Sequence, residues 1–136
     1  MKKSNKLRDA DYATLSDFRY TLRSFVRFSE ERAIEVGLTP QQHQGLLAIR
    51  GAERGAATIG YVAKRLFLKP HSATGLVDRL VDLELVTRQT AEHDRRQTQL
   101  FLSDKAEALL AALSTAHREE ILRLKPLLSE LLGRLD

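Results

Sequence analysis

Between residues 58 and 102 the spacing of apolar side chains changes from the period of a helix to that of a strand. Two stripes recur every three or four residues, as in amphipathic helices: Ile59, Val62, Ala63 and Leu66, then Ala73, Leu76, Val77 and Leu80. Residues 86–90 and 97–102 are instead rich in β-forming residue types, and residues 91–96 between them are polar. The pattern predicts two helices joined by a short connector and followed by a β-hairpin.

A helix-turn-helix followed by a hairpin is a winged helix, which we expect over residues 58–102. Pro70 supports the start of the second helix, because a backbone N–H at the first helical position has no intrahelical partner. In this arrangement one helix can enter the major groove of DNA while the hairpin reaches sideways to a minor groove.

Amphipathic helices are predicted on both sides of this segment. The first covers residues 11–36 and ends at Gly37, and a shorter one begins at Pro40 after a variant capping box. The last covers residues 103–136, with Ser103 as N-cap and with Pro126 expected to break or restart it. The predicted fold class is therefore mainly α (α+β), a winged helix flanked by N- and C-terminal helices in a single domain over residues 11–136.

The two terminal elements carry more apolar surface than one chain of this size can easily bury. We expect them to pair with a second copy, although packing on each other within a monomer is the alternative. The residues predicted to form this dimer contact are Leu15, Phe18, Leu22, Phe25, Leu127, Leu128, Leu131 and Leu135.

Charge and composition narrow the function classes. Lys and Arg number 22 against 18 Asp and Glu, and four of the cations lie in residues 1–10, a basic arm predicted to be flexible and either solvated or in contact with phosphates. Nucleic-acid binding therefore has to rest on charges at particular positions rather than on the net charge of the whole chain.

The absence of cysteine excludes disulfides and thiol chemistry. Without a membrane-length apolar run or a secretory signal, we expect a cytoplasmic protein with no membrane partner.

The sequence lacks the residue patterns that are typical of catalytic and metal-binding sites. The sequence contains no nucleophile–base pair, metal-ligand spacing or phosphate-binding glycine loop, so we expect neither an enzyme nor a cofactor or metal site. His43 and His117 have no companion at ligand spacing, and ordinary half-buried histidines are the expectation.

Four motifs in this order and spacing resemble the MarR-type transcriptional regulators: LTPQQHQGLLAI, TIGYVAKRL, HSATGLVDRLVDLELVTR and DRRQTQLFLSDKAEALL. The resemblance covers the chain from about Asp11 to its C-terminus. It implies a homodimeric winged-helix protein that binds double-stranded, pseudo-palindromic DNA, usually a repressor released by a small, often aromatic ligand. Two departures are the connector Phe67-Leu68-Lys69 and the segment Leu83-Glu84-Leu85, because relatives often carry glycine at both places.

The resemblance places base-reading side chains in the first turns of the second helix of the motif, at His71, Ser72 and Thr74. Local capping and solvation are the alternative for the hydroxyls. Gly75 indicates either a close approach to DNA or tight helix packing. Further predicted phosphate contacts are the cations Lys69, Arg79 and Arg88, each of which can also be a solvated charge. On the hairpin, Arg95 is expected to lie against a phosphate.

At the hairpin tip, Asp94 is predicted to accept a hydrogen bond from Arg96 and so aim that guanidinium into a minor groove. A surface salt bridge without any role in DNA binding is the alternative. The ligand pocket implied by the resemblance is expected near His43, lined by Phe18, Leu22 and Leu47. A winged helix used only for protein–protein contact is the alternative function, and the cations on the reading face argue against it.

Overall fold

The computed structural model describes residues 6–91 and 94–135, with the side chains of residues 91 and 94–97 excepted. It is mainly helical with one antiparallel hairpin, as predicted. Its elements are α1 (Asp9–Glu35), α2 (Pro40–Gly51), α3 (Ile59–Leu66), α4 (Pro70–Asp82), β1 (Val86–Ala91), β2 (Asp94–Leu102) and α5 (Asp104–Gly133). Within the described residues, no helix combines the length and the apolar content that crossing a bilayer requires.

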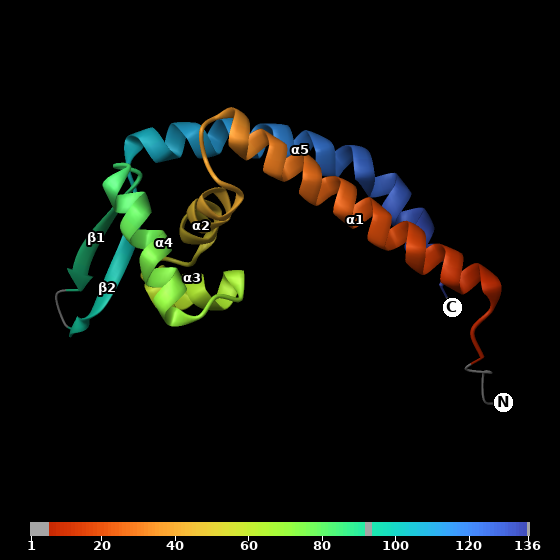
Figure 1. Cartoon of the computed structure of the whole chain (residues 1–136), viewed down its shortest axis with the longest axis horizontal. Helices are drawn as coiled ribbons and strands as arrows, with labels where there is room; N and C mark the ends of the chain where they lie inside the picture. Colours follow the sequence, from red (N-terminus) through yellow and green to blue (C-terminus); the bar gives the residue numbers. More distant parts are fainter. Residues whose placement is uncertain (1–5, 92–93, 136) are drawn as a thin grey trace.

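The chain divides into a lobe and an arm (Figure 1). The lobe contains α2, α3, α4 and the hairpin. The arm is formed by α1 and α5, which run side by side away from the lobe, so that the start of α1 and the end of α5 lie toward its far tip. The first turns of α5 lie over the lobe, so α5 belongs to both parts.

The helix starts predicted from the sequence are confirmed by their caps. Thr39 and Gln42 form a reciprocal capping box, and the hydroxyls of Thr58 and Ser103 accept the backbone N–H groups of Tyr61 and Ala106. The end of α1 is confirmed too: Gly37 has a φ of 84°, a left-handed conformation that suits glycine.

Several predicted boundaries were wrong. Helix α1 begins at Asp9, two residues before the predicted start, so Asp9 and Ala10 belong to the helix rather than to the predicted flexible arm. The prediction that Pro126 breaks the last helix fails, because α5 is one helix of 30 residues with Pro126 inside it. Pro126 is exposed, so water can satisfy the carbonyl group that its missing N–H leaves unpaired. The hairpin strands also extend further than predicted, to Ala91 and from Asp94, because cross-strand pairing outweighs the polar composition of that stretch.

Two non-glycine residues adopt a left-handed backbone at helix ends. Phe67 follows α3 with a φ of 54°, and Glu84 follows α4 with a φ of 59°. In both places a backbone N–H one residue further on reaches back to the last helical turn: Leu68 N to Ala63 O and Leu85 N to Leu80 O. Phe67 and Glu84 lie in the two segments where relatives often carry glycine, and both adopt the left-handed conformation without it.

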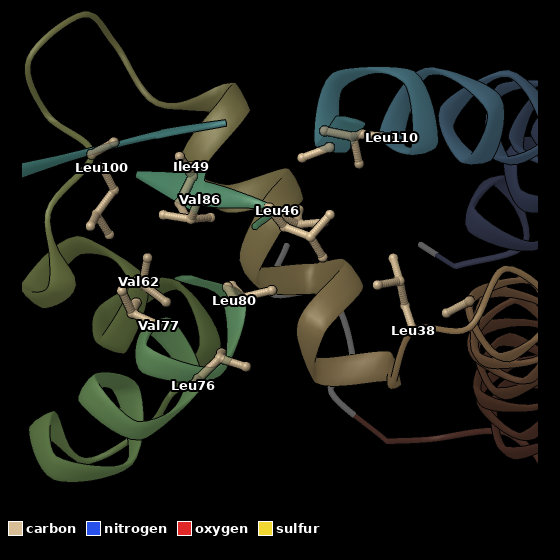
Figure 2. Packing of buried hydrophobic residues seen from close by; sticks show 14 of the residues in the cluster. Leu38, Leu46, Ile49, Val62, Leu76, Val77, Leu80, Val86, Leu100 and Leu110 are labelled. Carbon is tan, nitrogen blue, oxygen red and sulfur yellow. The ribbon is translucent and has the colours of Figure 1, made fainter. Parts of the chain in front are cut away.

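The lobe has a closed apolar core (Figure 2). Leu80 of α4 lies beside Leu46 of α2, Val77 of α4 belongs to the same buried cluster, and the base of the wing contributes Val86 and Leu100. Each of these five side chains is at most 2% exposed. Burying a Leu or Val side chain contributes about 1.5–3 kcal/mol, so this core holds α4 firmly against the rest of the lobe.

Candidate nucleic-acid interface

Helix α4 is held by one face and exposes the other. Its buried face consists of Ala73, Leu76, Val77 and Leu80, as predicted from the sequence. Lys69 is the N-cap, Pro70 is the first helical residue, and both are exposed. The N-terminal half of α4 therefore presents polar side chains to solvent from a rigid support.

The three predicted base-reading residues, His71, Ser72 and Thr74, are exposed together on the first turns of α4. The hydroxyl of Thr74 donates a hydrogen bond to the carbonyl oxygen of Pro70 at 3.0 Å. The local bonding that we kept as an alternative is therefore present at Thr74. Its oxygen lone pairs and its methyl group remain available to a base edge.

Among the described residues, no close packing contact explains the glycine in the middle of α4. A Cβ atom built at Gly75 would meet only the mobile end of Arg79, at 3.8 Å. At Gly45 of α2, by contrast, a Cβ atom would press on Leu76 Cδ2 at 3.3 Å. Gly45 is therefore the packing glycine, which sequence reasoning missed. Gly75 leaves open space on this side of α4, so the predicted close approach to DNA stays a prediction.

The predicted cations fall into two groups. Lys69 and Arg79 are exposed on α4. Arg88 of β1 instead forms an ion pair with Asp78 of α4. Sequence reasoning missed Lys64 and Arg65, two exposed cations in the last turn of α3, next to the connector that leads into α4. The adjacent pair of basic residues was visible in the sequence, but its place beside the start of α4 depends on the fold.

The hairpin is attached to the lobe at its base. The backbone N–H of Leu100 donates to the carbonyl oxygen of Ala57 at 2.8 Å, which joins β2 to the segment before α3. The Ser103 hydroxyl donates to the Glu84 carbonyl oxygen at 2.7 Å. The side chains of Asp94, Arg95 and Arg96 lie outside the described residues, so their predicted contact stays a prediction.

A second polar site joins the arm to the lobe. His43 of α2 is only 2% exposed, and its ring centroid lies 4.9 Å from that of His117 on α5. His117 Nδ1 donates to the Leu113 carbonyl oxygen at 2.6 Å, so its Nε2 accepts from the hydroxyl of Ser29 on α1 at 2.8 Å when the ring is neutral. Three helices thus meet at two imidazole rings.

His43 disfavours a proton in this setting. Burial lowers its pKa below the ordinary value of 6.5, and the neighbouring His117 lowers the pKa further. Among the described residues its Nδ1 atom is buried without a hydrogen-bond partner. The sequence predicted half-buried histidines, and the structure shows that one of them is fully buried.

The four predicted ligand residues are not gathered into one hollow. Phe18 is half-buried on α1, Leu22 is exposed beside it, and His43 is buried at the junction. Leu47 is 44% exposed and lines a separate depression with Tyr61 and Arg65. A larger groove of about 420 Å³ lies between α1, α2 and the end of α3, lined among others by Phe25, Ser29, Gln44, Arg65 and Phe67. Ser29 belongs both to this groove and to the histidine pair.

Comparisons with known proteins agree with this geometry. A profile of the MarR family matches residues 36–97. The HTH-type transcriptional regulator YsmB of Bacillus subtilis (strain 168) is 29% identical over 113 residues, which are 80% of this chain and 75% of that protein.

Solved structures with the same fold include a MarR family protein from Bacillus stearothermophilus. It has a TM-score of 0.73 at 22% identity, covering 96% of this chain and 99% of that one. A mutant of S. aureus MepR bound to an oligodeoxyribonucleotide has a TM-score of 0.70 at 19% identity, covering 92% and 98% of the two chains. With the exposed helix, the adjoining hairpin and the long paired helices, these matches show that the chain has the winged-helix fold of these structures and resembles the MarR family over residues 36–97.

Proposed function

We propose that this protein is a sequence-specific DNA-binding regulator that inserts α4 into a major groove. The observation that carries the proposal is the exposed polar half of α4, where His71, Ser72 and Thr74 stand on a helix whose other face is locked in the lobe core. Side chains that read bases need such a rigid platform, because each good contact depends on hydrogen-bond geometry. Lys69 and Arg79 flank them as candidates for phosphate contacts.

The first experiment is selection of a preferred duplex from a randomised library, followed by gel-shift titration. Ala at Ser72 or Thr74 should reduce the preference for the selected duplex over random DNA by about 1–3 kcal/mol for each good base contact that is lost. Equal losses on both DNAs would assign these residues to backbone contact. Failure of the wild-type protein to enrich or bind any duplex would overturn the proposed function.

The functional unit that we propose is a homodimer acting as a repressor at a pseudo-palindromic operator. Exposed apolar side chains on the arm support the dimer, among them Leu15, Leu22, Val26, Ile121, Leu122, Leu127 and Leu132. One member of the originally predicted contact drops out, because Leu131 is 2% exposed and is already covered within its own chain. Sedimentation at micromolar concentration is the measurement, and a monomer that binds DNA tightly would contradict the dimer.

The wing-tip proposal concerns Asp94 and Arg96. We propose that Asp94 orients the Arg96 guanidinium toward a narrow minor groove, with Arg95 against phosphate. Arg96→Ala should then weaken DNA binding and make it less dependent on salt concentration. Asp94→Ala should also weaken DNA binding, although it removes a negative charge. Simple electrostatics gives the opposite sign for Asp94→Ala, so a gain in affinity on the selected duplex would exclude the orienting role.

Release by a small, aromatic effector is the last part of the proposed function. The groove beside the histidine pair supports it, because Phe25 and Phe67 offer aromatic surface and Arg65 offers a cation. A screen of aromatic acids for loss of DNA binding tests the effector. Phe25→Ala should lower the potency of an active compound and Leu47→Ala should not. The reverse result would favour the depression near Leu47.

A further inference from the structure

The pair formed by Asp78 and Arg88 links the two elements that we expect to meet DNA. Asp78 lies on α4 and Arg88 on β1, and their side chains form an ion pair across the two elements. The Asp78 side chain is 55% exposed and that of Arg88 is 35% exposed, so the pair stands at the surface between helix and wing. The sequence alone predicts Arg88 to be either a phosphate contact or a solvated charge.

The register of the hairpin explains why Arg88 reaches α4. Residues directly opposite in an antiparallel pair point to the same face, and alternate residues of a strand share a face. Arg88 pairs with Leu100, and Val86 lies two residues before it. Both apolar neighbours are 2% exposed in the lobe core. Arg88 therefore lies on the face of the wing that covers the lobe, against which α4 packs.

Arg88 lies between the base of the wing, which is attached to the lobe, and the tip of the wing. The described anchors nearer the base are the buried side chains of Val86 and Leu100 and the bond from Leu100 N to Ala57 O. Beyond Arg88 the strand continues through Gln89, Thr90 and Ala91, which is roughly 10 Å at the usual rise per residue. A small change of angle at Arg88 is thus magnified toward the tip.

We propose that Arg88 is a positioning residue, which through Asp78 sets the angle between the wing and α4. The pair also neutralises the carboxylate that α4 would otherwise present to DNA. The proposal rests on the proposed function, because its effect on affinity presupposes that α4 and the wing bind DNA together. An exposed ion pair contributes at most about 1 kcal/mol to folding, so its loss should leave the lobe folded.

A double-mutant cycle on the selected duplex tests the proposal. Asp78→Asn and Arg88→Gln should each weaken binding severalfold, up to about fivefold, and the double variant should lose no more than either single one, because the two residues act as a unit. The charge-reversed variant, Asp78→Arg with Arg88→Asp, should recover most of the affinity. Asp82→Asn is the matched control. It removes the same charge from α4 at an exposed residue for which the described structure shows no ion pair, and should not weaken binding.

A direct phosphate contact by Arg88 makes different predictions. Asp78→Asn would then leave affinity unchanged or raise it, the two effects would add, and charge reversal would not restore binding. Any of these results would overturn the positioning role.

A second readout needs no DNA. Hydrogen exchange of backbone amides in β1 and β2 should speed up in both single variants and return toward wild type on charge reversal, while exchange in α5 stays unchanged. If the wild type binds no DNA but the wing responds in this way, the proposed function fails and the structural link stands. Unchanged exchange in both variants would overturn the link.

Discussion

The lobe and the arm treat their apolar side chains in opposite ways. The lobe encloses leucines and valines from α2, α3, α4 and the wing, and Leu46, Leu80 and Val62 are almost completely buried. The arm buries a thinner seam that includes two threonines, Thr14 and Thr21, whose hydroxyls donate to backbone carbonyl groups one turn earlier. It leaves several leucines about half exposed. The lobe core is therefore closed with the help of the first turns of α5, and most of the exposed large apolar side chains lie on the arm.

The largest effect should come from the lobe core. Leu80→Ala removes a side chain that is 0% exposed and should cost about 2–5 kcal/mol of unfolding free energy, because the cavity cannot collapse fully. The matched control is Leu83→Ala, since Leu83 at the end of α4 is 43% exposed and should cost about 0.5 kcal/mol. Urea unfolding measures both. Similar losses at the two positions would contradict a closed lobe core.

The arm should respond through association rather than folding. The double variant Leu15→Lys with Leu127→Lys should weaken dimer association by at least about 2 kcal/mol, because charges would then lie in an apolar contact. Leu83→Lys is the control, since Leu83 has the same 43% exposure but lies in the lobe. Sedimentation equilibrium gives the dissociation constants. If the arm variant associates like the wild type, the exposed leucines do not form the interface.

Substitution of Gly75 in α4 should change folding stability and DNA affinity in opposite directions. Gly75→Ala should stabilise the fold by about 1 kcal/mol, since alanine is the better helix former and the structure has room for its Cβ atom. It should nevertheless weaken DNA binding, because the methyl group occupies the side of closest approach. Gly60→Ala on α3 is the control, with room for a Cβ atom and no expected loss of binding. Unchanged DNA affinity for Gly75→Ala would remove the contact role.

A smaller gain in stability is expected at the end of α3. Phe67 is 96% exposed and left-handed, so Phe67→Gly loses almost no packing and relieves the backbone strain. We expect about 0.5–1 kcal/mol of stabilisation after the greater flexibility of glycine in the unfolded chain is counted. Phe67→Ala keeps the unfavourable φ and should gain nothing. Thermal unfolding of the two variants decides the matter, and equal gains would show that strain is not the cause.

The smallest effect is a pH dependence at the junction of lobe and arm. The folded pKa of His43 lies below its unfolded value, so the unfolded chain takes up a proton more readily. The stabilising contribution is thus fully present above about pH 6.5 and is lost as the pH falls through the folded pKa of His43. His43→Gln should flatten unfolding free energy against pH between 7.5 and 5. The control is His71→Gln, which makes the same substitution at an exposed position. An unchanged slope in His43→Gln would refute this assignment.

Local chemistry explains which features could be predicted. Caps at Thr39, Thr58 and Ser103 and the turn at Gly37 depend on residues next to them in the chain, so their positions were predictable. The buried face of α4 followed from its helical period. The low helix propensity of proline predicted a break at Pro126. Helix α5 nevertheless continues through this residue, because its packing against α1 stabilises the helix.

The sequence by itself determined the order of the elements, the winged-helix pattern and the exposed polar face of α4, because these depend on neighbours and on periods of two or 3.6 residues. Only the tertiary structure decided which side chains from distant segments meet. It paired Arg88 with Asp78, brought His43 and His117 together with Ser29, and assigned the packing role to Gly45 rather than Gly75. The physical reason is that such contacts depend on how helices cross and on which strand face covers them, and neither is encoded in a short stretch of sequence.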